Sequence, residues 1–544
     1  MSDQPTPPDR SPAGAAGHDE LRDPALDPTA SYALEPGYVR ALTEQVVATS
    51  RRTEPSVCPV NGQPLGHVPQ SEPGDVAEAF RRARRAQQAW VRTSLDERAA
   101  TMLRLHDLVL DRQSEIIDLI CWESGKARKH AFDEPLHIAL TARYYARSAH
   151  EHLDSHRVAG VVPALTHVEV NRIPKGVVGI ISPWNYPFTM ALCDGLPALM
   201  AGNAVVAKPD AQTMLSALLA KQLLEEAGFP PDLWQVVAGP GRVLGPEIIR
   251  HADHVCFTGS TATGALVAQQ CAQRLIGCSL ELGGKNPFLV LRDADLDRAA
   301  EGAVRASFSN AGQLCVSMER MFVADQVYDR FLAKFVERTE AMRLEVGLGW
   351  GSDMGSLISQ AQLDTVVRHV EDARAKGARV LTGGRARPDL GPYYFEPTIL
   401  EGVTPEMTCF GEETFGPVVS VYRFQDESDA VARANAGDYG LNASVYTRDA
   451  RRGRELARTI RCGTVNVNEA FAATFASVDA PMGGMHESGI GRRQGGEGIH
   501  RYTETQAVAT QRLLRFAPVL GMSDETYAKV MTAYLRLMKR LGRK

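Results

Sequence analysis

Apolar side chains between residues 75 and 152 recur at the three- and four-residue spacing of amphipathic helices. The first stretch, GDVAEAFRRARRAQQAW, has a basic outer face, and Asp75 is placed to cap it. LDERAATMLRLHDLVLDRQSEIIDLICWESGKA continues the same pattern. We therefore expect helices to dominate this first region of the chain.

Short apolar runs then alternate with helical stretches. The runs GVVGIIS, NAVVAKP, LWQVVAG and HVCFTGS predict strands, and the segments between and after them, such as TATGALVAQQCAQ, predict helices. The alternation resumes after Glu281, where NPFLVL and RMFVAD predict strands and LDRAAEGAVRASFSNAG predicts a helix. This order indicates βαβ units, parallel sheets and an α/β fold with a second α/β domain.

The composition is that of a globular protein. The chain has 544 residues, of which 44% are hydrophobic and 23% charged, so two or more domains are expected. The formal net charge of -5 gives no electrostatic reason to expect a nucleic-acid partner. The nine cysteines form no CxxC pair, which indicates neither a metal site nor a disulfide framework and favours the reducing cytoplasm.

The two ends of the chain differ from its middle. Residues 1–35 are rich in proline and acid, which predicts a disordered tail rather than a targeting peptide. No apolar run is long enough for an integral membrane segment. Residues 516–544 predict an amphipathic helix with a basic end, which either docks on this protein or a sister subunit or makes a peripheral membrane contact.

Two strand ends carry candidate ligand-binding residues. In HVCFTGSTATG, a strand leads through Gly259 into a helix start, whose backbone N–H groups suit a phosphate; an ordinary glycine turn is the alternative. In VVAKPDAQT, Lys208 lies at the carboxyl end of a strand, where open α/β sheets bind ligands. A solvated surface lysine is the commoner alternative.

Three further side chains suit acyl chemistry. Glu281 in SLELGGKNP precedes two glycines and is either a desolvated base or a strand-end ion-pair partner. Asn185 in PWNYPF could face an oxyanion or cap a turn. Cys315 in SNAGQLCVSMER has small or hydrogen-bonding neighbours, so a loop could bring its sulfur against a ligand; a small packed core residue is the alternative.

The order of these motifs is specific. PWNYPF, AKP, FTGS, ELGGKNP, NAGQLC and EETFGPV follow one another in this chain. With them, the chain resembles the NAD(P)-dependent aldehyde dehydrogenase superfamily from about residue 50 to about residue 512. The resemblance implies a Rossmann-like cofactor domain, an α/β catalytic domain and a small β oligomerisation arm.

The resemblance also implies roles for the residues of the motifs. Cys315 would add to the aldehyde carbon, Asn185 and the Cys315 backbone N–H would hold the oxyanion, and Glu281 would activate water against the thioester. Trp184 and Lys208 would serve the adenosine side of the cofactor, and Ser260 the pyrophosphate. Glu413 would bond the nicotinamide ribose and Phe415 would pack near the ring. The full cofactor set is Ser182, Trp184, Lys208, Ala211, Gly259, Ser260, Glu413 and Phe415.

The residue at position 211 bears on the choice between NADP and NAD. Ala211 stands where NAD-preferring relatives carry a glutamate, and it leaves room for a 2′-phosphate near Lys208, so NADP is favoured over NAD although Asp210 opposes this.

The resemblance also implies domain boundaries. The cofactor domain would span 36–155 and 176–281, the catalytic domain 282–490, and the arm 156–175 with 497–515. A homodimer or homotetramer is implied.

The amino-acid sequences of the motifs are most similar to those of the succinate-semialdehyde dehydrogenase branch. Members of that branch hold the distal carboxylate with arginines at two positions that are Cys193 and Ser309 here. Either another arginine, such as Arg320 or one within 461–492, replaces them, or the aldehyde is neutral and aliphatic or aromatic. Asp194 would repel an acid if it faced the tunnel. A CoA-acylating enzyme, a membrane-associated fatty-aldehyde enzyme and a non-catalytic protein are the remaining alternatives.

Overall fold

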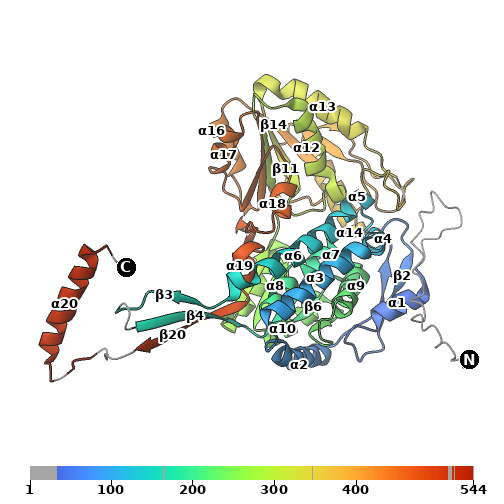
Figure 1. Ribbon diagram of the computed structural model, residues 1–544. Helices are drawn as coiled ribbons and strands as arrows, with labels where there is room; N and C mark the ends of the chain where they lie inside the picture. Colours follow the sequence, from blue (N-terminus) through green and yellow to red (C-terminus); the bar gives the residue numbers. More distant parts are fainter. Residues whose placement is uncertain (1–33, 163–165, 346, 512–516, 520, 543–544) are drawn as a thin grey trace, which may run out of the picture.

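The computed structural model describes residues 34–162, 166–345, 347–511, 517–519 and 521–542. It contains two α/β bodies stacked on one another and a β arm that projects from the side (Figure 1). The α/β class expected from the alternating pattern is therefore confirmed. The tail expected at residues 1–35 lies outside the described residues up to residue 33, and a first helix, α1, spans Pro36–Thr43.

The lower body is built on a six-stranded sheet in the order β19-β9-β8-β5-β6-β7. Its strands are parallel except β19, which pairs antiparallel with β9. The central strands are buried on both faces, as their continuous apolar runs require. The strands are β5 (Val177–Ile181), β6 (Ala204–Lys208), β7 (Trp234–Val236), β8 (His254–Thr258), β9 (Gly277–Glu281) and β19 (Gly489–Ile490).

Helices cover both faces of this sheet and include the helical region expected at residues 75–152. Helix α2 begins at Pro73, so Asp75 is not its N-cap; the Asp75 carboxylate instead accepts a hydrogen bond of 2.8 Å from the N-cap residue Glu72, as in a capping box. The helices are α2 (Pro73–Trp90), α3 (Leu95–Asp111), α4 (Gln113–Ser124), α5 (Arg128–Ala131), α6 (Asp133–Leu153), α7 (Pro187–Leu192), α8 (Gly195–Met200), α9 (Met214–Glu226), α10 (Gly241–His251), α11 (Thr261–Gln273) and α19 (Gly495–His500).

The upper body is built on a seven-stranded sheet in the order β12-β13-β14-β11-β10-β16-β17, in which only the edge strand β12 runs antiparallel to its neighbour. Its strands are β10 (Asn286–Val290), β11 (Met318–Ala324), β12 (Arg379–Thr382), β13 (Thr398–Glu401), β14 (Val418–Phe424), β16 (Asn442–Tyr446) and β17 (Thr464–Val467). Its helices are α12 (Leu296–Phe308), α13 (Tyr328–Glu340), α14 (Gln360–Ala375), α15 (Thr408–Gly411), α16 (Glu427–Ala434), α17 (Ala450–Ala457) and α18 (Ala472–Ala476).

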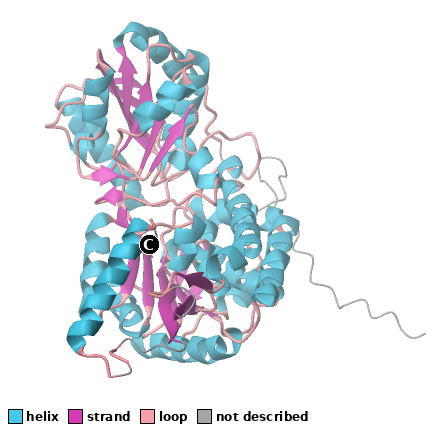
Figure 2. Cartoon of the chain, turned by 60° about the vertical axis from the view of Figure 1, so that its left-hand side comes forward, coloured by secondary structure: helices cyan, strands magenta, loops and turns pink. Residues whose placement is uncertain are grey.

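The arm is a three-stranded antiparallel sheet of β3 (His156–Val158), β4 (Thr166–Pro174) and β20 (Thr503–Gln511). The expected arm segment began at residue 497, but residues 497–500 belong to helix α19. Beyond the arm stands α20 (Asp524–Arg540), which comes forward with the arm in Figure 2. None of its residues is buried, and Tyr534 Oη donates a 2.9 Å hydrogen bond to the Val161 carbonyl of the arm.

The remaining short strands form two-stranded ribbons, β1 (Thr53–Val57) with β2 (Pro64–Pro69) and β15 (Tyr439–Gly440) with β18 (Met485–His486). Within the part of the chain that the structure describes, no helix combines the length and the apolar character needed to cross a membrane.

Candidate active site

Cys315 lies on a loop whose backbone the sequence alone did not predict. The helix expected to run to Gly312 ends at Phe308, and Asn310, Ala311 and Gly312 follow with φ values of 51°, 54° and 71°. Left-handed residues in succession cannot continue an α-helix, so the chain turns sharply before the thiol. A Cβ on Gly312 would lie 2.0 Å from the Gly416 carbonyl oxygen, which is why only glycine fits there.

Side-chain amides fix this loop. Asn310 Nδ2 donates to the carbonyl oxygens of Asn185 and Gln313, both at 3.0 Å, and Asn286 Nδ2 donates to the Cys315 carbonyl at 2.8 Å. Asn185 Nδ2 donates to the Gln313 carbonyl at 3.1 Å. The motifs PWNYPF, ELGGKNP and NAGQLC are thus joined by direct hydrogen bonds, which hold the thiol in place between the two bodies.

A cavity of about 240 Å³ opens at this loop. It brings together eight of the residues expected to form the site: Asn185, Trp184, Gly259, Ser260, Glu281, Cys315, Glu413 and Phe415. Ser182, Lys208 and Ala211 do not line it. They lie at the neighbouring strand ends, where the Ser182 N–H donates to the Lys208 carbonyl at 3.2 Å.

Glu281 is the last residue of β9 and reaches the cavity from the lower body. Its Oε1 is buried and has no hydrogen-bond partner among the described residues. Burial raises the pKa of this carboxyl to about 7, against the lowering effect of Arg493. A carboxylate that titrates near neutrality beside a thiol suits a general base.

Cys315 faces the cavity and is only partly exposed. Burial, with smaller contributions from Glu281 and Glu413 and against the effect of Arg493, raises the pKa of its thiol to about 12. The free thiol is therefore protonated at neutral pH, and a base must take its proton before it can attack a carbonyl.

The lower sheet offers a phosphate site at its carboxyl edge. Ser260 caps α11 and leaves the helix N-terminus at the cavity, and Gly259 stands directly before it. A Cβ on Gly259 would lie 2.7 Å from the Phe257 ring. Lys208 ends β6, and its Cε lies 3.8 Å from the position of a Cβ on Gly241, the first residue of α10. These residues fit a dinucleotide.

The opposite wall of the cavity comes from the upper body. Glu413 Oε1 accepts a 2.8 Å hydrogen bond from the Gly284 N–H, and burial raises the pKa of its carboxyl to about 8. The Phe415 ring meets the Trp184 ring edge to face, with centroids 5.5 Å apart. The resemblance implies an adenosine-side role for Trp184, and in the structure its ring lines the cavity of Cys315 together with Phe415.

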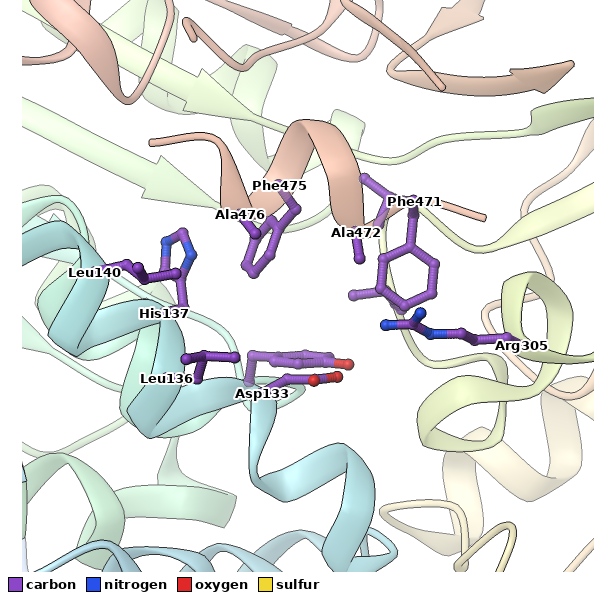
Figure 3. A pocket seen from close by; sticks show the side chains of 12 residues that line it. Asp133, Leu136, His137, Leu140, Arg305, Phe471, Ala472, Phe475 and Ala476 are labelled. Carbon is purple, nitrogen blue, oxygen red and sulfur yellow. The ribbon is translucent and has the colours of Figure 1, made fainter. Parts of the chain in front are cut away.

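A second, outer cavity of about 90 Å³ adjoins the first, and Tyr186, Leu314, Val316 and Phe475 line both. Figure 3 shows Arg305 of α12 pointing into it, opposite Asp133 of α6, while Phe475 of α18 and Phe471, the residue before that helix, lie above. Most of the other walls are apolar.

Arg305 is the cation of the outer cavity. Its guanidinium carbon lies 5.4 Å from the Phe471 ring centroid, and its Nη1 makes a long contact of 3.5 Å with Glu469 Oε1. The side chain is 48% exposed. Because this contact is long and single, most of the five N–H groups of the guanidinium remain able to donate to a ligand. Burial raises the pKa of the Asp133 carboxyl to about 6, with Arg305 opposing.

The sequence suggested Arg320 or an arginine within 461–492 as the cation for a distal carboxylate, but none of these side chains reaches the inner or the outer cavity among the described residues. Arg320 donates to four backbone carbonyls, of Lys285, Arg433, Ala434 and Ala436, and lines a different cavity. No arginine of segment 461–492 lines either the inner or the outer cavity among the described residues. Asp194 does not line them either, because Arg493 and Arg501 hold its carboxylate.

Three residues of the site were missed by the sequence reasoning. Asn286 lies in ELGGKNP, one motif in which only the glutamate was considered. Arg305 occupies an ordinary helical position, four residues before Ser309, and belongs to no motif that would mark it as a functional residue. Arg493 lies in GIGRRQGG, where the glycines could have marked a tight approach; the pairing of Gly489 with Glu281 brings it to the site.

The geometry defines a class of protein: an α/β enzyme with a dinucleotide-type sheet edge and a cysteine and a glutamate facing one cavity. The model of the aldehyde dehydrogenase family matches residues 46–508. The chain belongs to this family, and the resemblance of its motifs is confirmed.

Individual relatives share most of the chain. A Mycolicibacterium smegmatis protein, provisionally named succinate-semialdehyde dehydrogenase [NADP(+)], is 50% identical over 492 residues, which are 90% of this chain and 95% of that one. The 3-sulfolactaldehyde dehydrogenase of Pseudomonas putida is 36% identical over 90% of this chain and 98% of its own. The crystal structure of succinate-semialdehyde dehydrogenase from Burkholderia pseudomallei matches with a TM-score of 0.82 and 35% identity, covering 86% of this chain and 96% of that one.

Proposed function

We propose that the protein oxidises an aldehyde to a carboxylic acid with NADP or NAD, and that the aldehyde is succinate semialdehyde. The observation that carries the proposal is the cavity in which Cys315, Glu281 and Asn185 meet at the carboxyl edge of the lower sheet. Family membership supports the reaction type.

The chain's own residues divide the reaction into two steps. The Cys315 thiol loses its proton to Glu281 and the sulfur adds to the aldehyde carbon, giving a thiohemiacetal whose oxygen is held by the Asn185 amide and the Cys315 N–H. Trp184, Ser260, Glu413 and Phe415 would hold the cofactor, whose chemistry would be to remove a hydride from that carbon, so that a thioester would remain on Cys315. Glu281 releases the first proton to solvent and then takes a proton from water as the hydroxyl adds to the thioester carbon. The carbon–sulfur bond breaks, the acid leaves, and Glu281 returns this proton to the departing thiolate, which restores the thiol and the carboxylate.

The adenosine end of the site favours NADP. Ala211 is exposed and carries no carboxylate that would repel a 2′-phosphate. Lys208 and the N-terminus of α10 lie close together and can both face an anion. The relative named with NADP(+) supports the same preference. Asp210 does not oppose it strongly, because its carboxylate caps the following turn by accepting a 3.0 Å hydrogen bond from the Gln212 N–H.

An anionic group at the far end of the aldehyde suits Arg305. The substrate would extend from Cys315 in the inner cavity to Arg305 in the outer one, past the four side chains that line both. The carboxylate would then receive charge-assisted hydrogen bonds. The aldehydes in the names of two relatives, succinate semialdehyde and 3-sulfolactaldehyde, both carry such a distal anion.

A neutral aliphatic or aromatic aldehyde is the second candidate. The outer cavity is walled mainly by leucine, valine, phenylalanine and alanine, and Asp133 opposes an anion. A CoA-acylating reaction is a weaker candidate, because Glu281 lies where it can activate water.

The test is kcat/KM over an aldehyde panel with NADP and with NAD, with and without CoA. The proposal expects succinate semialdehyde to rank above butanal and benzaldehyde, with NADP preferred and no CoA requirement. A neutral aldehyde ranking first would replace the substrate; no oxidation of any aldehyde would refute the reaction type.

Two further proposals concern the setting of the enzyme. The arm strands support assembly into a homodimer or homotetramer, which light scattering of the purified chain would test. A chain that stayed monomeric at micromolar concentration would refute the assembly.

The second proposal is a cytoplasmic location. It is supported by the nine cysteines, all of which are free thiols of the kind that a reducing compartment preserves.

A further inference from the structure

A buried cluster of three charges lies behind the catalytic cavity. Asp194, before α8, accepts hydrogen bonds from Arg493 Nη2 at 2.8 Å and from Arg501 Nη2 at 2.6 Å. The side chains of Asp194 and Arg493 are 5% and 4% exposed, and that of Arg501 is 10% exposed. Burial alone would raise the pKa of Asp194, but the two arginines hold it below its ordinary value.

The charges in the cluster do not cancel. Both guanidiniums are positive at any working pH, whereas the cluster contains one carboxylate. Nε of Arg493 and Nε of Arg501 are buried and have no hydrogen-bond partner among the described residues. One positive charge is therefore left over in a region with little water, where it acts on its neighbours with little screening.

Arg493 carries this charge into the active site. It lines the inner cavity with Cys315 and Glu281, while its Nη2 donates to Thr258 Oγ1 at 3.0 Å and its Nη1 contacts Met190 Sδ at 3.4 Å. Arg501 stays behind, against the Tyr502 ring. The pairing with Asp194 thus fixes the orientation of the one arginine that faces the thiol.

Charged and titratable groups from each packed element surround Arg493 or the two groups, Glu281 and Cys315, that share its cavity. Helix α6 contributes His137, the α7–α8 loop Cys193 and Asp194, and β9 Glu281. The cysteine loop contributes Cys315, the upper body Glu413, and the segment around α19 Arg492 and Arg501. Burial, together with the charge of Arg493, lowers the pKa of His137 to about 3, so this histidine is neutral. Of the remaining groups, Glu281 and Cys315 are the two that exchange the proton in the proposed reaction, and Arg493 acts on both.

We propose that Asp194, which Arg501 holds from the other side, orients Arg493 as a positioning residue whose positive charge stabilises the one negative charge that Glu281 and Cys315 share. When the thiol passes its proton to Glu281, the carboxylate becomes a neutral acid and the sulfur becomes a thiolate. The number of charges is unchanged, and both forms face the same guanidinium. Arg493 therefore keeps the thiolate accessible in a cavity that otherwise favours the protonated thiol.

The experiment measures the rate at which iodoacetamide alkylates Cys315 as a function of pH, by mass spectrometry of the Cys315 peptide in the full chain. No aldehyde or cofactor is present, so the result does not depend on the proposed function. The Cys278 peptide, from the distant end of β9, is the internal control. Wild type is compared with Arg493→Met, Arg493→Lys and Asp194→Asn, and thermal melting shows which variants fold.

Arg493→Met is expected to slow alkylation at pH 7.5 about tenfold and to raise the pH midpoint by about one unit. Arg493→Lys should stay near wild type. Asp194→Asn removes the compensating charge and should move the midpoint downward, opposite to Arg493→Met. A merely structural role would slow Arg493→Met and Asp194→Asn alike, which would overturn the proposal, as would wild-type rates in Arg493→Met. If Arg493→Met does not fold, an Asp194→Asn midpoint at or above that of Arg493→Lys overturns it.

Discussion

The inner and outer cavities of this enzyme place their charged groups in different ways. The inner cavity takes Glu281 from a strand end and Cys315 from a left-handed turn, so the backbone fixes both. The outer cavity takes Arg305 and Asp133 from helices, and Arg305 reaches it with a long side chain. Arg493 of the inner cavity is 4% exposed, whereas Arg305 of the outer one is 48% exposed.

This difference in exposure indicates that the inner cavity controls reactivity and the outer cavity contributes to substrate selection. A buried charge acts with little screening, so the inner residues can change the reactivity of a neighbouring group by orders of magnitude. A half-exposed charge is screened by water and salt, so Arg305 can select among substrates but only modestly. Changes in the inner cavity should therefore affect every aldehyde, and changes in the outer cavity only the anionic ones.

The largest effect is expected from Cys315→Ala. Removing the nucleophile should lower kcat/KM by at least about 10⁴-fold for all aldehydes, in steady-state assays of cofactor reduction. Cys278→Ala, at a half-exposed thiol outside both cavities, is the matched control and should keep wild-type turnover. Turnover that survives in Cys315→Ala would contradict the assignment of the nucleophile.

Glu281→Gln should lower kcat by about 10³-fold, because no base remains to activate water. In the wild type, kcat should fall about tenfold per pH unit below about 7, since the base works only when deprotonated and its pKa is raised to about 7. The profile of the variant should be flat across this range. An acid limb that persists in Glu281→Gln would assign the titration to another group.

Gly312→Ala tests whether the backbone of the cysteine loop is required. Its Cβ would meet the Gly416 carbonyl oxygen at 2.0 Å and the residue has φ of +71°, so unfolding free energy should fall by about 3 kcal/mol. Gly377→Ala is the matched control, with φ of +100° and open space, and should cost about 1 kcal/mol. Denaturant melts measure both, and equal losses would show that the close approach is unimportant.

The smallest effect is expected from Arg305→Met. It should raise KM for succinate semialdehyde about tenfold, through the lost charge-assisted contacts, and leave KM for butanal unchanged. Arg298→Met, on the same helix but directed at the Asn468 carbonyl, should change neither. If both aldehydes weaken equally, Arg305 shapes the cavity rather than selecting the anion.

Periodic segments were predictable because their pattern repeats locally. TATGALVAQQCAQ was expected as a helix and is α11, and NPFLVL contains β10. The turn at 309–312 was not predictable, because its left-handed residues are imposed by contacts with the Gly416 segment, about a hundred positions away. Arg493 was missed for a similar reason, since only the pairing of β19 with β9 brings it beside Glu281.

Mapping the covalent intermediate would test the central claim most directly. Wild type is mixed with one equivalent of NADP and excess succinate semialdehyde, quenched in acid within the first turnover, digested and analysed by mass spectrometry. The account predicts one equivalent of reduced cofactor and a succinyl thioester on the Cys315 peptide. Reduced cofactor without an acyl group on Cys315, or an acyl group on another residue, would contradict it.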